Sequence, residues 1–225
     1  TVPKVELASL FFDRYHVIYN IHIAEFFLNQ AILFDSQDST PPAYAYYQLA
    51  RISFIQGNLN TALKQLDTEA FHYPDHSKVF YIRGLTLGYL GRDTEAVESF
   101  REYVRQNGSS WAGRNDLAWL LFKQGKFKEA LAVIQPAYEK NPDNPWVLNT
   151  YGTLLMNTGD LFTAHDILVQ GYNASLLITE EGWGLAYPGN NPAVYRQGLE
   201  GMRSSFLKNM QLVEEKLRAK GTPLY

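Results

Sequence analysis

The sequence predicts an all-α fold, an α-solenoid of helix–turn–helix repeats, and four sets of evenly spaced residues carry that prediction. Four alanines recur 34 residues apart: Ala62, Ala96, Ala130 and Ala164. A glycine stands five residues before each alanine: Gly57, Gly91, Gly125 and Gly159. A fixed period of this length is typical of stacked units, because each unit buries its apolar face only against its neighbours.

Two further positions of each unit follow the same period. Twelve residues before each alanine stands a small residue: Ala50, Gly84, Ala118 and Gly152. Four residues after each alanine stands a large apolar residue: Leu66, Phe100, Ile134 and Leu168. We expect two helices to approach closely at the small residues. The glycine between the small residue and the repeat alanine lies in a polar turn, and helices often end in a left-handed residue of this kind. Each unit is therefore predicted to be a helix, a tight turn and a second helix.

This pattern resembles the tetratricopeptide repeat family over about 42–174. The small residue, the glycine turn, the alanine and the large apolar residue match in all four units, and Pro74 and Pro142 fall at the family's terminal proline. The sequence departs from the family where Arg114 and Leu148 replace an early aromatic residue and where Gly108 replaces a proline. These departures affect individual packing contacts and leave the register intact.

The whole chain, 1–225, is predicted to be one superhelical domain. Residues 1–41 form an N-terminal helix pair, with apolar residues at helical spacing in 4–18 and 21–34. The four repeats cover 42–174, and 175–225 hold a degenerate repeat and a long capping helix. We expect the fifth first helix at 176–187 and the cap from 192 to about 220. An apolar stripe runs along the cap: Leu199, Met202, Phe206, Met210, Val213 and Leu217.

Composition narrows the possible partners. The net charge is −3, and the repeats carry basic and acidic residues in nearly equal number, which argues against a nucleic-acid partner. There is no cysteine, so disulfides and thiol chemistry are excluded, and no apolar stretch is long enough to span a membrane. A chain that starts at Thr1 is typical of a processed or truncated protein, so the cytoplasm and a bacterial envelope both stay open as locations.

No residue pattern indicates catalysis, a cofactor or a metal site. The densest histidine cluster holds His72 and His76, but Pro74 between them forbids the regular helix that would align two metal ligands. The cluster is therefore predicted to be a solvated loop between repeats. Phosphate-binding glycine loops and nucleophile elbows do not occur in the sequence.

The family resemblance implies a concave groove, lined by the first helix of each repeat, that holds a partner segment. The positions that would face this groove are Tyr44, Tyr47, Arg51, Phe54, Lys78, Tyr81, Tyr89, Asn115, Trp119, Phe122, Trp146, Asn149 and Asn157. Aromatic residues and arginine are enriched at interface hot spots, and the paired asparagines can bond a peptide backbone. As an alternative, Tyr47, Tyr81, Trp119 and Phe122 pack between repeats.

The predicted function is a non-enzymatic scaffold for protein–protein interaction that binds a peptide or an extended protein segment in the groove. The alternative is an assembly or oligomerisation subunit of a larger complex, for instance at a bacterial envelope. In that case the N-terminal helices or the stripe Leu199–Leu217 contact the complex or another copy of the chain.

Overall fold

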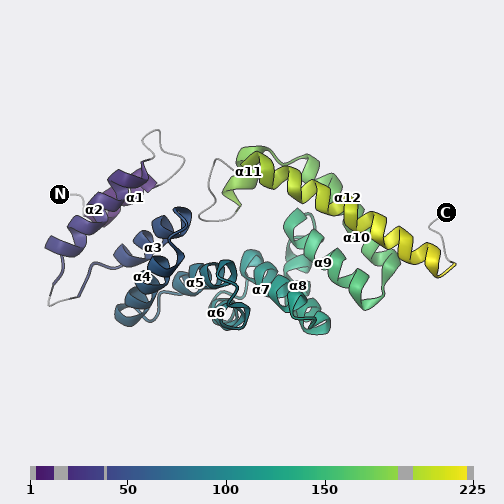
Figure 1. Ribbon diagram of the computed structural model, residues 1–225, viewed down its shortest axis with the longest axis horizontal. Helices are drawn as coiled ribbons and strands as arrows, with labels where there is room; N and C mark the ends of the chain where they lie inside the picture. The colour runs from purple at the N-terminus through teal and green to yellow at the C-terminus, as the bar shows by residue number, and fades with distance from the viewer. Residues whose placement is uncertain (1–3, 13–19, 38–39, 187–194, 222–225) are drawn as a thin grey trace. The chain divides into compact units, whose positions relative to one another are not determined.

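The computed structural model describes residues 4–12, 20–37, 40–186 and 195–221, and these residues fold into helices (Figure 1). They divide into two compact units, 1–103 and 104–225. The first unit holds α1 (Lys4–Phe12), α2 (Ile21–Phe34), α3 (Ala45–Ile55), α4 (Leu59–His72), α5 (Lys78–Tyr89) and most of α6 (Asp93–Gln106). The second holds α7 (Trp111–Lys123), α8 (Phe127–Lys140), α9 (Pro145–Thr158), α10 (Leu161–Leu176), α11 (Glu180–Leu185) and α12 (Tyr195–Ala219). The all-α prediction is confirmed.

The four predicted repeats correspond to four helix pairs: α3 with α4, α5 with α6, α7 with α8, and α9 with α10. In each pair the predicted glycine ends the first helix, and these glycines have φ angles between +73° and +97°. Only glycine enters this left-handed region without steric cost, which explains why it recurs at the turn.

Close helix approach occurs at the small residues, as predicted. A Cβ atom added to Gly84 would lie 2.8 Å from the ring of Phe100, and one added to Gly152 would lie 2.8 Å from Leu168. Ala50 and Ala118, at the same slot in the other two pairs, are fully buried. In the two pairs with glycine, the large residue after the repeat alanine therefore packs into the space that the small residue leaves.

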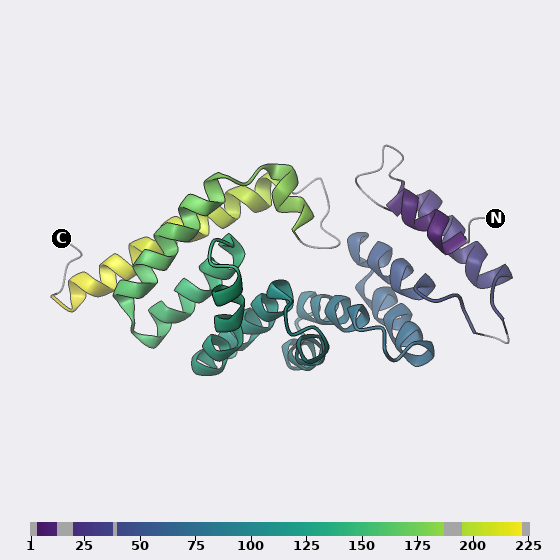
Figure 2. The same cartoon turned by 180° about the vertical axis from the view of Figure 1, so that it is seen from behind.

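The N-terminal helix pair belongs to the core of the first unit. Helices α1 and α2 lie side by side in both views (Figure 2). One apolar cluster joins them to α3 and consists of Ala8, Phe12, Ala24, Leu28, Ala45, Leu49 and Ile52. The predicted helix over 4–18 begins at Lys4, and its second part, 13–18, lies outside the described residues.

The C-terminal region differs from the prediction in one respect. Helix α10 continues to Leu176, so the predicted fifth first helix at 176–187 is reduced to the six residues of α11. Thr179 starts α11, because its hydroxyl accepts a hydrogen bond from the Gly182 amide at 3.0 Å.

The long capping helix is present as α12, which runs along α10 (Figure 1). The predicted stripe faces the core of the second unit: Phe206 and Val213 are fully buried, in one cluster with Leu148 and Leu168. Gly171 of α10 makes room for this contact, since a Cβ atom there would lie 2.4 Å from the Phe206 ring.

A pair of glycine substitutions tests this packing. Gly171→Ala is expected to lower the free energy of unfolding by about 1–3 kcal/mol, because the methyl group overpacks the contact with Phe206. Gly201→Ala, on α12 with nothing within 4 Å of its Cβ, should instead raise stability by about 0.5–1 kcal/mol. Calorimetry measures both changes, and equal melting temperatures for the two variants would contradict the proposed packing.

Candidate functional site

The thirteen predicted groove residues differ widely in exposure. Five are exposed: Tyr44, Lys78, Tyr89, Trp119 and Asn157. Five are half-buried: Arg51, Phe54, Phe122, Trp146 and Asn149. Three are buried: Tyr47, Tyr81 and Asn115. A binding role stays a prediction for all of them, and exposure decides which are available to a partner in this structure.

In the first unit the predicted aromatics separate into packing and surface residues. The ring of Tyr81 packs against Phe100 and Tyr103, with centroids 5.6 and 5.0 Å away. Phe54 and Tyr89, near the ends of α3 and α5, meet edge to face at 5.4 Å, and Tyr89 is 74% exposed. The pair of Phe54 and Tyr89 therefore presents aromatic surface to solvent.

The second unit carries a comparable aromatic surface on α7. Trp119 stacks on Phe122 with ring centroids 5.1 Å apart, and Phe122 in turn touches Phe127 of α8 at 5.5 Å. Trp119 is 44% exposed. The Phe122 contacts hold the indole in place and leave part of it open to solvent.

Two of the predicted asparagines, Asn115 and Asn149, form hydrogen bonds between helices of the second unit. The Thr150 hydroxyl of α9 donates to the side-chain oxygen Oδ1 of Asn115 of α7 at 2.7 Å. The Asn209 amide of α12 donates to Thr153 of α9 at 3.0 Å and to Asn149 at 3.4 Å. Helix α12 thus bonds to α9 as α9 bonds to α7, and it takes the place that the sequence assigned to residues 176–187.

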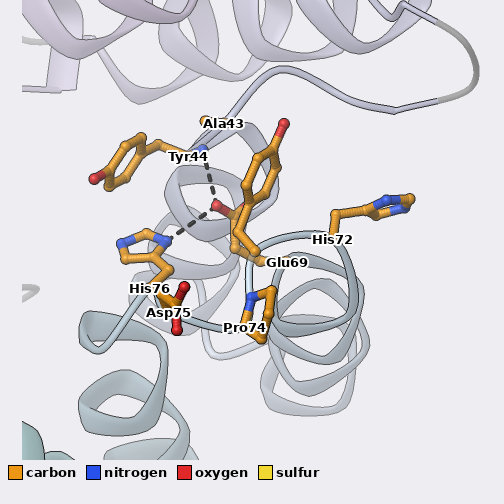
Figure 3. Close-up of a pocket in the computed structure, with 8 residues that line it drawn as sticks. Ala43, Tyr44, Glu69, His72, Pro74, Asp75 and His76 are labelled. Atoms are coloured by element: carbon orange, nitrogen blue, oxygen red, sulfur yellow. Dashed lines mark hydrogen bonds and ion pairs between the residues drawn. The ribbon is translucent and has the colours of Figure 1, made fainter.

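A cavity of about 420 Å³ lies in the first unit, at the start of α3 and the turn between α4 and α5 (Figure 3). Its walls are formed by Ala43, Tyr44, Glu69, His72, Tyr73, Pro74, Asp75 and His76. Five of these residues, 72–76, form the histidine cluster that the sequence assigns to a solvated loop. Two carboxylates and two histidines therefore line a single hollow.

A side chain of another helix, Glu69 of α4, caps the N-terminus of α3. Its side chain is fully buried, and it accepts hydrogen bonds from the backbone N–H of Tyr44 at 2.8 Å and of Tyr47 at 3.2 Å. Helices α7 and α9 are capped locally, by Ser110 and Asn144. The residue at the N-cap of α3, Tyr44, makes no side-chain cap, so a carboxylate 25 residues away satisfies the free amides.

His76 completes the cap, and its position corrects the prediction for the histidine cluster. Its Nδ1 lies 3.0 Å from Glu69 Oε1, and the side chain is only 7% exposed (Figure 3). The rings of Tyr44 and Tyr47 cover it, with centroids at 4.2 and 4.6 Å. The loop of His72 and His76 is therefore not fully solvated, because the buried carboxylate draws His76 inward as a hydrogen-bond partner.

Glu69 was missed in the sequence, although the repeat register contains the signal. It stands seven residues after Ala62, and the same slot after the other repeat alanines holds Tyr103, Ala137 and Gly171. Ala137 and Gly171 are buried, so the slot belongs to the core. A charged residue at a core slot needs a partner, so the register predicts that the Glu69 carboxylate is paired or hydrogen-bonded.

Burial changes the acid–base behaviour of Tyr47, which lies beside this cap. Desolvation raises the pKa of the Tyr47 phenol above its ordinary value, and the nearby Arg51 partly opposes that shift. Within the ranges that the structure describes, no three His, Asp or Glu side chains are placed to share a metal ion. Among those same residues, no helix combines the length and the apolarity needed to cross a membrane.

The fold and these surfaces define a helical-repeat protein, a class whose stacked units present side chains for contact with other macromolecules. Family models described as "Tetratricopeptide repeat" match residues 81–145 and 121–171. Residues 81–171 are therefore tetratricopeptide repeats. The match falls within the region where the sequence already shows the period.

The chain is also similar to known proteins. It is 29% identical over 124 residues to the N-terminal acetyltransferase A complex auxiliary subunit NAA15 of Arabidopsis thaliana, covering 55% of this chain and 14% of that relative. Among solved structures, MamA AMB-1 has a TM-score of 0.62 at 18% identity, covering 79% of this chain and 91% of that one. YrrB, titled "a TPR protein with an unusual peptide-binding site", has a TM-score of 0.59 at 19% identity, covering 86% and 97%. These structural likenesses show the fold.

Replacing the buried carboxylate tests the cap of α3. Glu69→Gln places an NH₂ group against a backbone N–H donor, so we expect a loss of about 1–3 kcal/mol in the free energy of unfolding. Hydrogen exchange at the Tyr44 and Tyr47 amides should be faster than in the parent. Glu98→Gln, at an exposed position of α6, is the matched control. Unchanged exchange at both amides in Glu69→Gln would contradict the capping role.

Alkaline titration tests the burial of Tyr47. Its raised pKa means that the folded protein favours the neutral phenol, so this stability is present below pH ~10 and is lost as the pH rises through the higher folded value. Tyr47→Phe should therefore make the decline in stability above pH ~10 shallower, as measured by urea unfolding at each pH. Tyr89→Phe, at an exposed position, is the control and should keep the decline of the parent.

Proposed function

We propose that this chain is a non-enzymatic scaffold for protein–protein interaction that binds a peptide or an extended protein segment through the exposed faces of its first helices. One observation carries the proposal: each unit exposes an aromatic pair near the end of a first helix. The pairs are Phe54 with Tyr89 in the first unit and Trp119 with Phe122 in the second.

The register supports a shared role for these pairs. Phe54 and Phe122 stand four residues after the small residues Ala50 and Ala118, so both occupy the same place in their repeats. Each holds a more exposed aromatic partner, Tyr89 or Trp119. An aromatic side chain that is already fixed by a neighbour loses little conformational freedom on binding, and its buried area then contributes to affinity.

The relatives bear on the kind of partner. YrrB carries a peptide-binding site by its title, and its fold resembles that of this chain over 86% of the length. NAA15 is by its name an auxiliary subunit of a complex. The chain spans 14% of that relative, so the likeness supports a protein partner and not a particular complex.

Assembly through the stripe Leu199–Leu217 has less support. Leu199, Phe206, Val213 and Leu217 are at most 3% exposed, because they pack inside the second unit. A partner would have to displace α12 to reach them. The exposed first-helix aromatics need no such rearrangement.

Selection of peptides from a random displayed library, followed by anisotropy titrations, tests the proposal. Trp119→Ala and Tyr89→Ala should each weaken a selected peptide roughly 30-fold, which corresponds to about 2 kcal/mol at a hot spot. Circular dichroism melts should stay close to those of the parent, because neither side chain is buried in the core: Tyr89 is 74% exposed and Trp119 44%.

The matched controls are exposed aromatics on second helices. Phe71 of α4 is 81% exposed and Phe162 of α10 is 51% exposed, and their replacement by alanine should leave affinity unchanged. The proposal fails if Phe71→Ala or Phe162→Ala weakens binding as much as the first-helix variants do, or if no peptide is enriched over an unrelated helical protein.

A further inference from the structure

We propose that the aromatic surface at the end of α7 docks an acidic protein segment, one that carries aspartate or glutamate beside an apolar anchor. This inference rests on the proposed peptide-binding function and names the chemistry of the partner at one of its two aromatic pairs. The segment 117–128, which holds the end of α7 and the start of α8, contains Lys123, Lys126 and Lys128 and neither aspartate nor glutamate. All three lysines are exposed, so a segment with acidic side chains is the complementary partner.

The lysines border the aromatic surface itself. Lys126 and Lys128 flank Phe127 in the chain, and the Phe127 ring lies 5.5 Å from that of Phe122. Phe122 in turn stacks on Trp119 at 5.1 Å, so the three rings form one continuous surface. Protein interfaces commonly combine an apolar centre with a charged rim: the centre supplies buried area, and the rim selects and steers the partner.

Two of these lysines contribute little to the fold. Lys126 and Lys128 make no hydrogen bond or ion pair with any residue that the structure describes. Lys126 stands at the N-cap of α8 and makes no side-chain cap, and the first turn of that helix holds a single acidic residue, Glu129. Positive side chains are unfavourable at a helix N-terminus, because the helix dipole already places positive charge there. Residues that break a local rule of stability without a structural gain are expected at functional sites.

The excess of lysine is not a property of the repeat period. The same span in the other repeats carries fewer basic residues: one arginine in 49–60, two arginines and one aspartate in 83–94, and one aspartate alone in 151–162. Arg92, three residues after the exposed Tyr89, is bonded to Glu95 at 2.7 and 2.6 Å. The aromatic pair of the first unit therefore lacks a comparable basic border, and the selection of acidic partners is assigned to the surface on α7.

A nucleic acid is the other kind of partner that combines negative charge with groups that stack on aromatic rings. Proteins that bind single strands align a long basic groove with the phosphates, whereas 117–128 offers three lysines on one turn and no arginine. The net charge of −3 also repels a polyanion. An acidic protein segment, with a few carboxylates beside an apolar side chain, fits this surface better.

Two synthetic peptides with blocked termini test the inference against the full chain by fluorescence anisotropy. The acidic peptide is acetyl-Gly-Asp-Glu-Phe-Leu-Asp-Glu-Gly-amide, and the neutral peptide has Asn and Gln in place of Asp and Glu. The acidic peptide should bind about tenfold more tightly at low salt, since several exposed charge pairs each add a small contribution. Raising the salt from about 50 mM to about 500 mM should remove most of this advantage, because exposed charges are screened.

Variants of the chain locate the binding. Lys126→Ala combined with Lys128→Ala should reduce the advantage of the acidic peptide to about threefold or less, since two of the three lysines are gone. The matched control is Lys140→Ala combined with Lys208→Ala, which removes two exposed lysines elsewhere in the second unit and should keep the advantage. Trp119→Ala should weaken the acidic and the neutral peptide alike, because both place their apolar side chains on the rings.

Four results would overturn the inference: equal affinity for the two peptides, equal effects of the two double variants, no effect of Trp119→Ala on the acidic peptide, or tighter binding of decathymidine than of the acidic peptide. The proposed function is judged separately, by the library selection. A selected peptide that requires Trp119 but neither Lys126 nor Lys128 overturns this inference alone, whereas a library that yields no binder overturns the proposed function.

Discussion

The structure depends on one steric complementarity that is repeated along the chain: a small residue on the first helix of a pair accepts a large apolar residue from the second. Gly84 accepts Phe100 and Gly152 accepts Leu168, at distances that leave no room for a methyl group. Because the approach is this close, the turn between the helices must be tight, and a left-handed glycine supplies it. The same principle operates once more at Gly171, where the ring of Phe206 fixes α12 on α10.

The starts of α3, α7 and α9 depend on a different interaction, the hydrogen bonds that their first amides make with side-chain acceptors. Ser110 and Asn144 supply these acceptors locally for α7 and α9. Helix α3 has no such residue, and Glu69 of α4 takes over. This exchange of a local cap for a distant one buries a carboxylate, draws in His76 and fixes Tyr44 at positive φ. One missing cap therefore accounts for several features of the cavity.

Features that recur with the repeat period were predictable from the sequence, whereas features that depend on tertiary partners were not. The helix pairs, the glycine turns and the small residues belong to the first kind, because each recurs at 34 residues and four copies agree on its place. The position of α11 belongs to the second, since Gly182 and Gly184 interrupt the only copy of that segment. For the site, helical position alone did not separate Tyr89, which is exposed, from Tyr81, which is buried against Phe100 and Tyr103. That difference arises from tertiary neighbours.

The distant cap of α3 also limits how the repeats can be recombined. In a helical-repeat array, units are often regarded as interchangeable modules, because each contacts only its neighbours. Here Glu69 of the second helix caps the first amides of its own repeat, and the following turn supplies His76 to that carboxylate. A chimera that joined α3 and α4 to the turn of another repeat would keep the carboxylate and lose the imidazole that shares it. The smallest transferable module therefore does not end with α4 at His72 but extends through the turn to His76.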